Sequence, residues 1–265
     1  MEENMELTRL NKWLSESGIC SRREADRLIE EGRILVNGQR ALTGMKVSGT
    51  ESIICDGRDV SHKKKDKPVL LAVNKPKGIV CTTSQKDRAE NIVDFLHYPI
   101  RIYPIGRLDK DSTGLLLMTN QGDIVNKILR ESNAHEKEYL VRVTQPLTRE
   151  FLSQMRQGVD ILDTRTKPCF VEQTGGYTFR IILKQGLNRQ IRRMCRALGY
   201  HVAALKRVRV MNIRLGDMKP GEYREITQEE WEDMSKLLAG SSSLSYKERL
   251  DSSREGEKAY GRKGL

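Results

Sequence analysis

The sequence predicts an α+β protein in which a small N-terminal module precedes a larger domain with a largely antiparallel mixed sheet and flanking helices. Apolar strand segments and amphipathic helical segments alternate between residues 69 and 238, and the pair Gly175-Gly176 joins two strands into a hairpin. The charged segment 62–68 ends in proline and is typical of an interdomain linker. A chain of 265 residues has room for both domains.

The N-terminal module is predicted over residues 7–67. Leu10 and Leu14 belong to an apolar helical stripe, and the capping box formed by Ser21 and Glu24 starts a second helix at Arg22. The pairs that follow are typical of tight turns between strands, at Asn37-Gly38 and Asp56-Gly57. Two short helices therefore lead into a small sheet.

The second domain is predicted over residues 68–238. The apolar patterns predict strands at 69–73, 101–105, 115–119, 137–144 and 177–184, and a strand-like stretch broken by basic residues at 202–215. Helices are predicted at 121–130, 148–157, 189–199 and 227–238, the last opened by a capping box at Thr227 and Glu230. Residues 239–265 are rich in serine and charge, and we expect a disordered tail there.

The composition excludes several classes of protein. The net charge of +11 indicates a polyanionic partner, although the total alone does not separate nucleic acid from a membrane surface. No apolar run is long enough to cross a membrane, and the acidic N-terminus does not resemble a signal peptide, so we expect a cytoplasmic protein. The five cysteines are scattered and the four histidines lack ligand spacing, which indicates reduced thiols and no metal site.

The excess positive charge is concentrated in one segment. Residues 1–62 carry a net charge of −2, whereas residues 184–214 contain basic residues and no acid. On a helix over 188–199, Ile191 and Met194 belong to an apolar face, and the opposite face carries Arg189, Arg192, Arg193 and Arg196. A row of guanidinium groups suits phosphate or carboxylate binding, and the alternative is an ordinary solvated face, which usually mixes charges of both signs.

A second basic group lies in the N-terminal module. Arg23 and Arg27 are four residues apart on one helical face, with Arg22 beside them. These residues either contact phosphates or belong to a solvated surface, and their spacing alone favours the solvated surface.

The candidate chemical centre is the charged loop over residues 105–116. Gly106 and Gly114 bracket Asp109 and Asp111 between two strand segments. On spacing alone, such aspartates are more often turn residues than catalytic ones. No glycine-rich nucleotide motif is present, so no nucleotide cofactor is indicated.

Three ordered motifs resemble those of the pseudouridine synthases. Residues 106–109 (GRLD) with 112–116 (STGLL) resemble the family's catalytic motif, and 137–141 (KEYLV) resembles its tyrosine motif. Residues 186–194 (GLNRQIRRM) are similar to the third motif in the form used by the RsuA-type branch. Residues 9–38 resemble the α-L RNA-binding module that often precedes the catalytic domain there. The resemblance covers residues 7–238 and implies a pseudouridine synthase domain after that module.

The resemblance implies a role for four residues. Asp109 is the essential carboxylate, acting at the sugar either as a nucleophile or as a base that generates a glycal. Arg192 pairs with Asp109, and a nearby guanidinium favours the ionised carboxylate. Tyr139 stacks on the flipped uracil, unless it is an ordinary core tyrosine. Arg107 enters the RNA stem in place of the extruded base. The reaction that the resemblance implies, isomerisation of uridine to pseudouridine in RNA, requires neither metal nor cofactor.

The implied partner is RNA, and we expect a monomer that binds it through basic side chains. The candidate RNA-binding residues, besides Arg107, are Arg22, Arg23, Arg27, Lys75, Arg189, Arg193, Arg196 and Arg207. Because A-form RNA hides its major-groove edges, we expect recognition of loops, shape and backbone.

The substrate follows from the likeness within the branch. Residues 10–27 and 135–139 look most like those of a large-subunit enzyme, which implies uridine isomerisation in 23S ribosomal RNA, with tRNA as a further substrate. The open alternatives are 16S ribosomal RNA or another 23S site, a catalytically inactive RNA-binding protein, and a different base-acting enzyme such as a glycosylase or methyltransferase.

Overall fold

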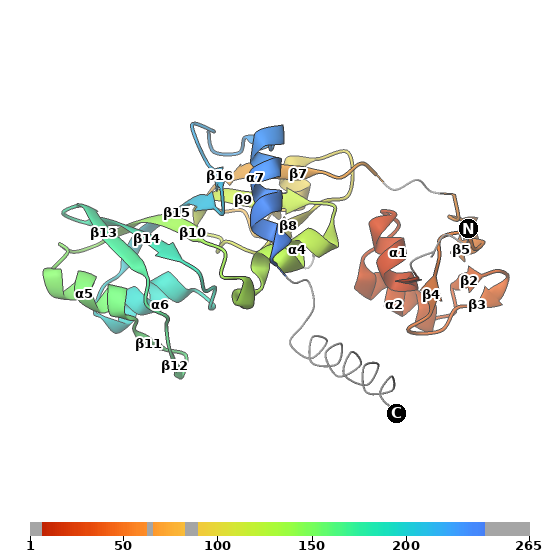
Figure 1. The fold of residues 1–265 in the computed structure, drawn as a ribbon, viewed down its shortest axis with the longest axis horizontal. Coiled ribbons are helices and arrows are strands. Elements are labelled where there is room, and N and C mark those ends of the chain that lie inside the picture. The colour runs from red at the N-terminus through yellow and green to blue at the C-terminus, as the bar shows by residue number, and fades with distance from the viewer. Residues whose placement is uncertain (1–6, 63–65, 83–89, 242–265) are drawn as a thin grey trace, which may run out of the picture. The chain divides into compact units, whose positions relative to one another are not determined.

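The computed structural model describes residues 7–62, 66–82 and 90–241 (Figure 1). The chain forms two compact units, one containing residues 1–68 with 98–101 and the other containing 69–97 with 102–265. The central residues of the predicted linker, 63–65, and residues 242–265 of the predicted tail lie outside the described residues.

The first unit has two helices and small antiparallel sheets. Helices α1 (Leu10–Glu16) and α2 (Arg22–Glu30) bury Leu14 and Leu28. The side chain of Ser21 accepts a hydrogen bond from the Glu24 backbone N–H, which confirms the predicted start of α2. The strands are β1 (Thr8–Arg9) paired with β4 (Lys46–Val47), and the sheet β3 (Gln39–Arg40), β2 (Ile34–Val36), β5 (Ile53–Cys55) and β6 (Arg58–Asp59).

The predicted turns of this unit are confirmed. Asn37 and Gly38 have φ angles of 50° and 78° in the turn from β2 to β3. Asp56 and Gly57 have φ angles of 52° and 74° between β5 and β6. Both turns use the left-handed region, which asparagine, aspartate and glycine adopt most readily.

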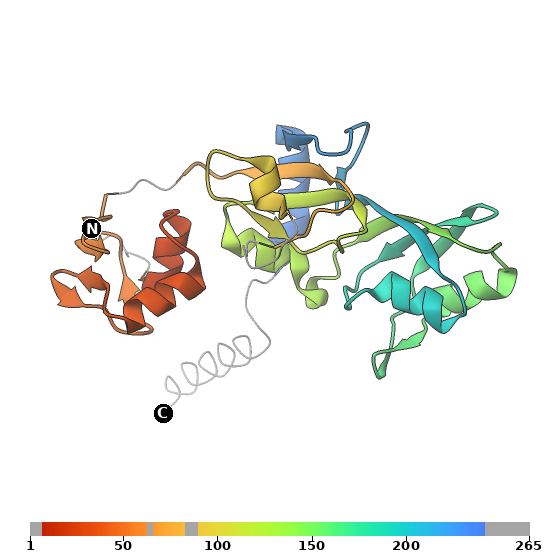
Figure 2. The same ribbon diagram turned by 180° about the vertical axis from the view of Figure 1, so that it is seen from behind.

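The second unit is built on a nine-stranded sheet with the order β13-β14-β10-β15-β9-β7-β17 (Figure 2). Strand β16 pairs with β15, and β8 pairs with β9. The bounds are β7 (Leu70–Lys75), β8 (Tyr103–Ile105), β9 (Thr113–Thr119), β10 (Lys137–Val143), β13 (Phe170–Gly175), β14 (Thr178–Leu183), β15 (Val202–Val210), β16 (Ile213–Arg214) and β17 (Tyr223–Glu225).

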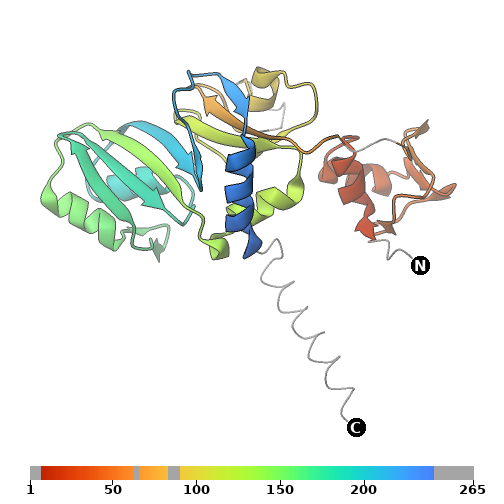
Figure 3. The ribbon, with the colours of Figure 1, turned by 45° about the horizontal axis from the view of Figure 1, so that its top comes forward.

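Helices cover the two halves of this sheet (Figure 3). One core contains Phe151 and Met194 from α5 (Arg149–Gln157) and α6 (Gln190–Ala197), with β10, β13 and β14. The other contains Ile128 and Met234 from α4 (Gly122–Leu129) and α7 (Gln228–Ala239), with β7 and β9. The remaining elements are α3 (Ile92–Leu96), the 3₁₀ turn η1 (Glu131–Asn133) and the hairpin β11 (Asp160–Ile161) and β12 (Thr164–Arg165).

The two halves meet where β9 runs parallel to β15. All other strand pairs in the sheet are antiparallel, so the predicted mixed sheet is confirmed. At the junction Gly114 lies opposite Arg207 with a φ angle of 97°, and a Cβ atom there would collide with the backbone of Arg207. Glycine is therefore required for this close approach, directly after the candidate catalytic loop.

The stretch 202–215 differs from the sequence prediction. It forms one continuous strand, β15, then turns at Met211, which has a φ angle of 53°, and returns as β16. The basic residues do not break the strand, because Arg207 is buried in the sheet and Arg209 is neutralised by acidic neighbours. The short elements α3, β11, β12 and β17 have no counterpart in the prediction.

Candidate active site

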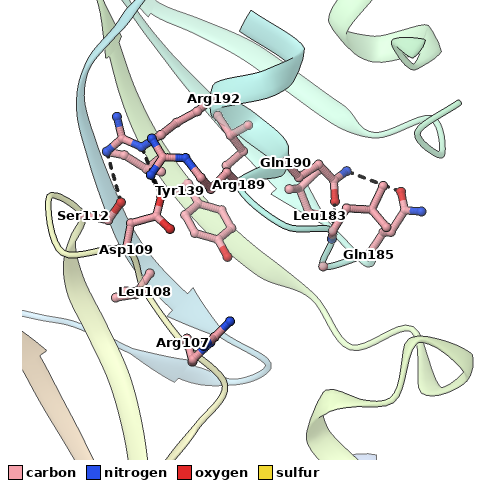
Figure 4. A pocket seen from close by; sticks show the side chains of 14 residues that line it. Arg107, Leu108, Asp109, Ser112, Tyr139, Leu183, Gln185, Arg189, Gln190 and Arg192 are labelled. Atoms are coloured by element: carbon pink, nitrogen blue, oxygen red, sulfur yellow. Dashed lines mark hydrogen bonds and ion pairs between the residues drawn. The ribbon is translucent and has the colours of Figure 1, made fainter. Parts of the chain in front are cut away.

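A pocket in the second unit collects residues from three separate segments (Figure 4). The loop between β8 and β9 contributes Asp109 and Ser112, strand β10 contributes Tyr139, and the start of α6 contributes Arg189 and Arg192. The structure thus brings together the three residues predicted to be catalytic.

Asp109 and Arg192 form an ion pair at the centre of the pocket. Arg192 Nε lies 3.3 Å from Asp109 Oδ2, and Arg192 Nη2 donates to Ser112 Oγ over 3.2 Å. Arg189 Nη1 lies 3.9 Å from the same carboxylate oxygen. The side chain of Arg192 is 16% exposed and that of Asp109 is 29% exposed, so the carboxylate is reachable while its guanidinium partner is held in place.

Hydrogen bonds from Lys75 and from two backbone N–H groups fix the loop that carries Asp109. Lys75 Nζ donates to the backbone oxygens of Pro76 and Ser112, at 2.7 and 2.9 Å. The Leu108 N–H donates to Cys81 Sγ, and the Ser112 N–H donates to the Asp109 carbonyl oxygen. These contacts leave the Asp109 side chain free to face the pocket.

The prediction that Lys75 binds RNA is wrong. Its side chain is fully buried, and burial lowers the pKa of its amine. Its ammonium group donates to the backbone carbonyls of Lys110 and Ser112 in the catalytic loop and to that of the neighbouring Pro76. Lys75 has a structural role.

Tyr139 and Arg107 flank the carboxylate. The Tyr139 ring lies next to Asp109 and faces the pocket, whereas Arg107 extends from the exposed rim (Figure 4).

The start of α6 is held by two glutamines. Gln190 accepts a hydrogen bond from the Leu187 N–H and donates to the side chain of Gln185, while Gln185 accepts from the Lys167 N–H. Arg189 precedes the helix with a φ angle of 49°. The sequence prediction assigned no role to Gln185, Gln190 or Ser112, although the last two lie within its motifs.

The four arginines of residues 189–196, of which Arg192 was predicted to be catalytic and the others to bind RNA, fall into two environments. Arg189, Arg193 and Arg196 are exposed, and Arg193 donates to the Asn188 carbonyl oxygen. Arg192 instead turns into the pocket. The helix therefore offers both an inner arginine for the carboxylate and outer arginines for an anionic partner.

Arg207, also predicted to bind RNA, is not available at the surface for an RNA phosphate. Arg207 is 4% exposed and its Nε donates to the Leu115 carbonyl oxygen. Arg209 pairs with Glu136 at 3.0 Å and with Glu138 at 2.7 Å. The basic segment in the sequence is therefore not a continuous basic surface, because β10 places its acids against β15.

The candidate phosphate contacts of the first unit are also unequal. Arg22 and Arg23 are exposed at the start of α2. Arg27 is exposed too, but it pairs with Glu24 and, at 2.9 Å, with Glu31. Arg22 and Arg23 are thus better placed for an added anion than Arg27.

The described residues contain neither a candidate metal site nor a candidate membrane-spanning helix. Within residues 7–62, 66–82 and 90–241, no cluster of three or more His, Cys, Asp or Glu side chains could hold a metal ion. No helix in that part of the chain is long and apolar enough to cross a membrane. All five cysteines are free.

Comparison with known proteins identifies the family. The family model for RNA pseudouridylate synthases matches residues 69–197, and that for S4 domains matches residues 8–53. The Dual-specificity RNA pseudouridine synthase RluF of Salmonella typhi is 55% identical over 236 residues, which are 89% of this chain and 81% of the relative. The chain belongs to the RNA pseudouridine synthase family.

Further relatives of this RNA pseudouridine synthase are also named as pseudouridine synthases. The RluF protein of Escherichia coli K12 is 53% identical over 89% of this chain and 81% of its own length. The Ribosomal large subunit pseudouridine synthase B of Bacillus subtilis is 34% identical over 84% of this chain and 94% of its own length. A crystal structure of a pseudouridylate synthase superposes with a TM-score of 0.63 at 28% identity, covering 85% of this chain and 99% of that one.

The region that matches the synthase family contains all three central site residues. Asp109, Tyr139 and Arg192 lie within residues 69–197, whereas β15 and α7 follow that region. The S4 match falls on the first unit and includes Arg22, Arg23 and Arg27. The enzyme therefore consists of an S4 domain followed by a synthase domain with an α+β fold.

Proposed function

We propose that this enzyme isomerises a specific uridine of 23S ribosomal RNA to pseudouridine, with Asp109 as the essential group, and that tRNA is a second substrate. The single observation that carries the proposal is the pocket that joins the Asp109 carboxylate, the Arg192 guanidinium and the Tyr139 ring. The large-subunit assignment is supported by the names of the relatives, and tRNA is the second class we infer from the word dual-specificity.

The chemistry requires that the target uridine leaves the RNA stem. Flipping costs a few kcal/mol, which contacts of the protein to the RNA must offset. Exposed Arg107 at the pocket rim is the residue we assign to the space left by the base. Tyr139 then stacks on the uracil that enters the pocket.

Asp109 acts on the sugar. Either its carboxylate attacks the anomeric carbon, or it removes the proton from the 2′ carbon and a glycal forms. In both cases the bond between uracil N1 and the ribose breaks, and its electron pair stays on the uracil. The base then turns and C5 bonds to the anomeric carbon, either as the bond from that carbon to Asp109 breaks or, in the glycal route, as Asp109 returns the proton to the 2′ carbon. The C5 proton is then lost and N1 gains a proton. Arg192 holds Asp109 ionised and oriented through this sequence.

The remaining basic residues are assigned to the RNA backbone. We propose that Arg189, Arg193 and Arg196 of α6 contact phosphates near the target, and that Arg22 and Arg23 do so from the S4 domain. Arg27 is a weaker contact because its guanidinium already pairs with Glu24 and Glu31.

We further propose the boundaries and state of the enzyme. Residues 7–67 form the RNA-binding module, 68–238 form the catalytic domain, and 239–265 form a tail. We also propose that the enzyme is a monomer, and a ribosomal RNA substrate supports action in the cytoplasm.

The experiment is a pseudouridine map of ribosomal RNA and tRNA from a deletion strain of the source organism. We expect one 23S position to lose its modification, to regain it with the wild-type gene, and to stay unmodified with Asp109→Asn. A deletion strain that retains every pseudouridine would contradict the proposal and favour the inactive RNA-binding alternative. Loss of a 16S position instead would reassign the substrate.

A further inference from the structure

A half-buried lysine and a buried arginine lie on the face of the sheet that carries the pocket. Tyr139 of β10 pairs with Arg207 of β15, and Lys137 of β10 pairs with Leu183 of β14. Tyr139 and Leu183 both line the pocket. Because directly opposed residues of antiparallel strands project from the same face, Arg207 and Lys137 belong to the pocket's side of the sheet.

Neither cation has a carboxylate partner in the part of the chain described. Arg207 Nε donates to the Leu115 carbonyl oxygen, but its Nη2 is buried without any hydrogen-bond partner among the described residues. Lys137 Nζ donates to the His135 carbonyl oxygen. Glu138, the next residue along β10 after Lys137, projects from the opposite face of the sheet and pairs there with Arg209.

Two neighbouring cations without a carboxylate partner raise the free energy of the folded protein unless an anion binds beside them. Burial of an unpaired charge is unfavourable, and two cations side by side add repulsion. Burial and the charge of Arg207 lower the pKa of Lys137 to about 8, so that its amine still carries a proton at neutral pH. The described residues thus place positive charge on the pocket's face of the sheet without a carboxylate partner among them.

We propose that Lys137 and Arg207 form a cationic floor, defined as these two side chains, that stabilises the negative charge on the uracil while it is detached from the ribose. The inference rests on the proposed function. It adds two residues whose task is distinct from that of Asp109 and Arg192, because those act at the sugar and these act on the base.

The reaction places a transient negative charge on the uracil, and this charge explains why positive side chains are needed near the base. When the N1–C1′ bond breaks, its electron pair remains on the uracil, and the negative charge spreads over N1 and the two carbonyl oxygens. The sugar is neutralised separately, by a bond to the Asp109 carboxylate or by loss of the 2′ proton. The anion disappears when C5 bonds to the sugar, the C5 proton leaves and N1 is protonated. Preorganised positive charge lowers the free energy of such a transient anion.

The test compares two leaving bases in the full-length enzyme. Single-turnover rates of loss of the N1-linked target nucleoside are measured by nuclease digestion and chromatography on RNA that carries uridine or 5-fluorouridine at the target. Loss of this nucleoside is the quantity compared because C5 of 5-fluorouridine has no proton to lose in the final step. Fluorine withdraws electrons and stabilises the detached base by itself. Lys137→Met removes the charge and Lys137→Arg keeps it. The control Lys236→Met removes one charge from an exposed lysine of α7 that pairs with Asp233.

We expect Lys137→Met to lower the uridine rate about 100-fold, as for removal of one preorganised donor, and the 5-fluorouridine rate much less. Lys137→Arg should restore most of the uridine rate, and Arg207→Lys should repeat the pattern of Lys137→Met more weakly. Melting temperatures confirm that the variants are folded.

Equal losses with the two bases in Lys137→Met, in a folded variant, would overturn the inference, because a structural defect slows both substrates alike. An unaltered uridine rate would overturn it as well. Either result leaves the proposed function intact, because conversion of the uridine RNA by the wild-type enzyme is measured in the same experiment. Absence of activity in the wild-type enzyme, by contrast, contradicts the proposed function.

Discussion

Arg192 donates from Nε to the carboxylate of Asp109 and from Nη2 to the hydroxyl of Ser112, at 3.3 and 3.2 Å. The arginine belongs to α6, whereas both acceptors belong to the loop before β9. One guanidinium group therefore locks together two segments that are remote in sequence. Its planar fork fixes the direction of the carboxylate as well as its charge.

This geometry predicts that Arg192 cannot be replaced by another cation. Lysine keeps the charge but cannot donate to Asp109 and Ser112 at once. We expect Arg192→Met to lower the single-turnover rate about 100-fold, as for other preorganised donors, and Arg192→Lys to fall in between. The control is Arg165→Met, which removes an exposed arginine that pairs with Asp160. A wild-type rate in Arg192→Met would show that the pair is dispensable.

The junction between β9 and β15 predicts a large stability effect at Gly114. Alanine there would combine a φ angle of 97° with a collision against the Arg207 backbone. We expect Gly114→Ala to destabilise the synthase domain by about 2 kcal/mol or more. Gly176→Ala is the control because no atom lies within 4 Å of its added Cβ. Melting temperatures measure both, and equal values for the two variants would contradict the packing described.

The sequence predicted these local features well. The turn at Asn37-Gly38, the helix caps at Ser21 and Thr227 and the amphipathic face of α6 all depend on residues close together in the chain. The three central site residues were predicted because their motifs resemble those of a known family.

The incorrect predictions concern residues whose burial or ion pairing depends on partners that are distant in the sequence. Lys75 and Arg207 were predicted to bind RNA, but each is buried by a strand or loop distant in sequence. Glu136 and Glu138 neutralise part of a segment that contains no acid of its own. Charge counted along the chain does not reveal such cross-strand pairs, since the register of β10 on β15 decides them.

The lowered pKa of Lys137 predicts a pH dependence of the rate. With a pKa of about 8, the amine is protonated below pH 8 and loses its charge above it. We expect the single-turnover rate to decline above about pH 8 in the wild type. In Lys137→Arg the decline should move to higher pH, because a guanidinium keeps its proton. His135 is neutral in this range, since burial lowers its pKa further. Identical pH profiles would contradict the assignment.

The same pKa predicts a stability effect with a defined sign. The folded-state pKa of Lys137 lies below its ordinary value of 10.5, so the folded state disfavours the protonated amine. The cost is full below pH 8 and fades as the pH rises towards 10.5. Lys137→Met should therefore raise the melting temperature more at pH 7 than at pH 10. A gain that is larger at pH 10 would have the wrong sign.

The S4 domain predicts unequal contributions to RNA affinity. Arg22→Gln with Arg23→Gln should weaken binding and reduce the slope of log affinity against log salt by about two, one for each lost phosphate contact. Arg27→Gln should change the slope less, because Arg27 is paired with Glu24 and Glu31. Filter binding of ribosomal RNA over a salt series measures these slopes. A larger effect for Arg27→Gln would reassign the contact surface.

Release of tritium from carbon-5-labelled uridine in ribosomal RNA tests the central claim most directly. Asp109→Asn removes the carboxylate from the pocket, whereas Asp111→Asn removes the same charge from an exposed position in the same loop. The account predicts that Asp109→Asn releases no tritium above background while Asp111→Asn remains active. Release by Asp109→Asn at the wild-type rate would contradict it.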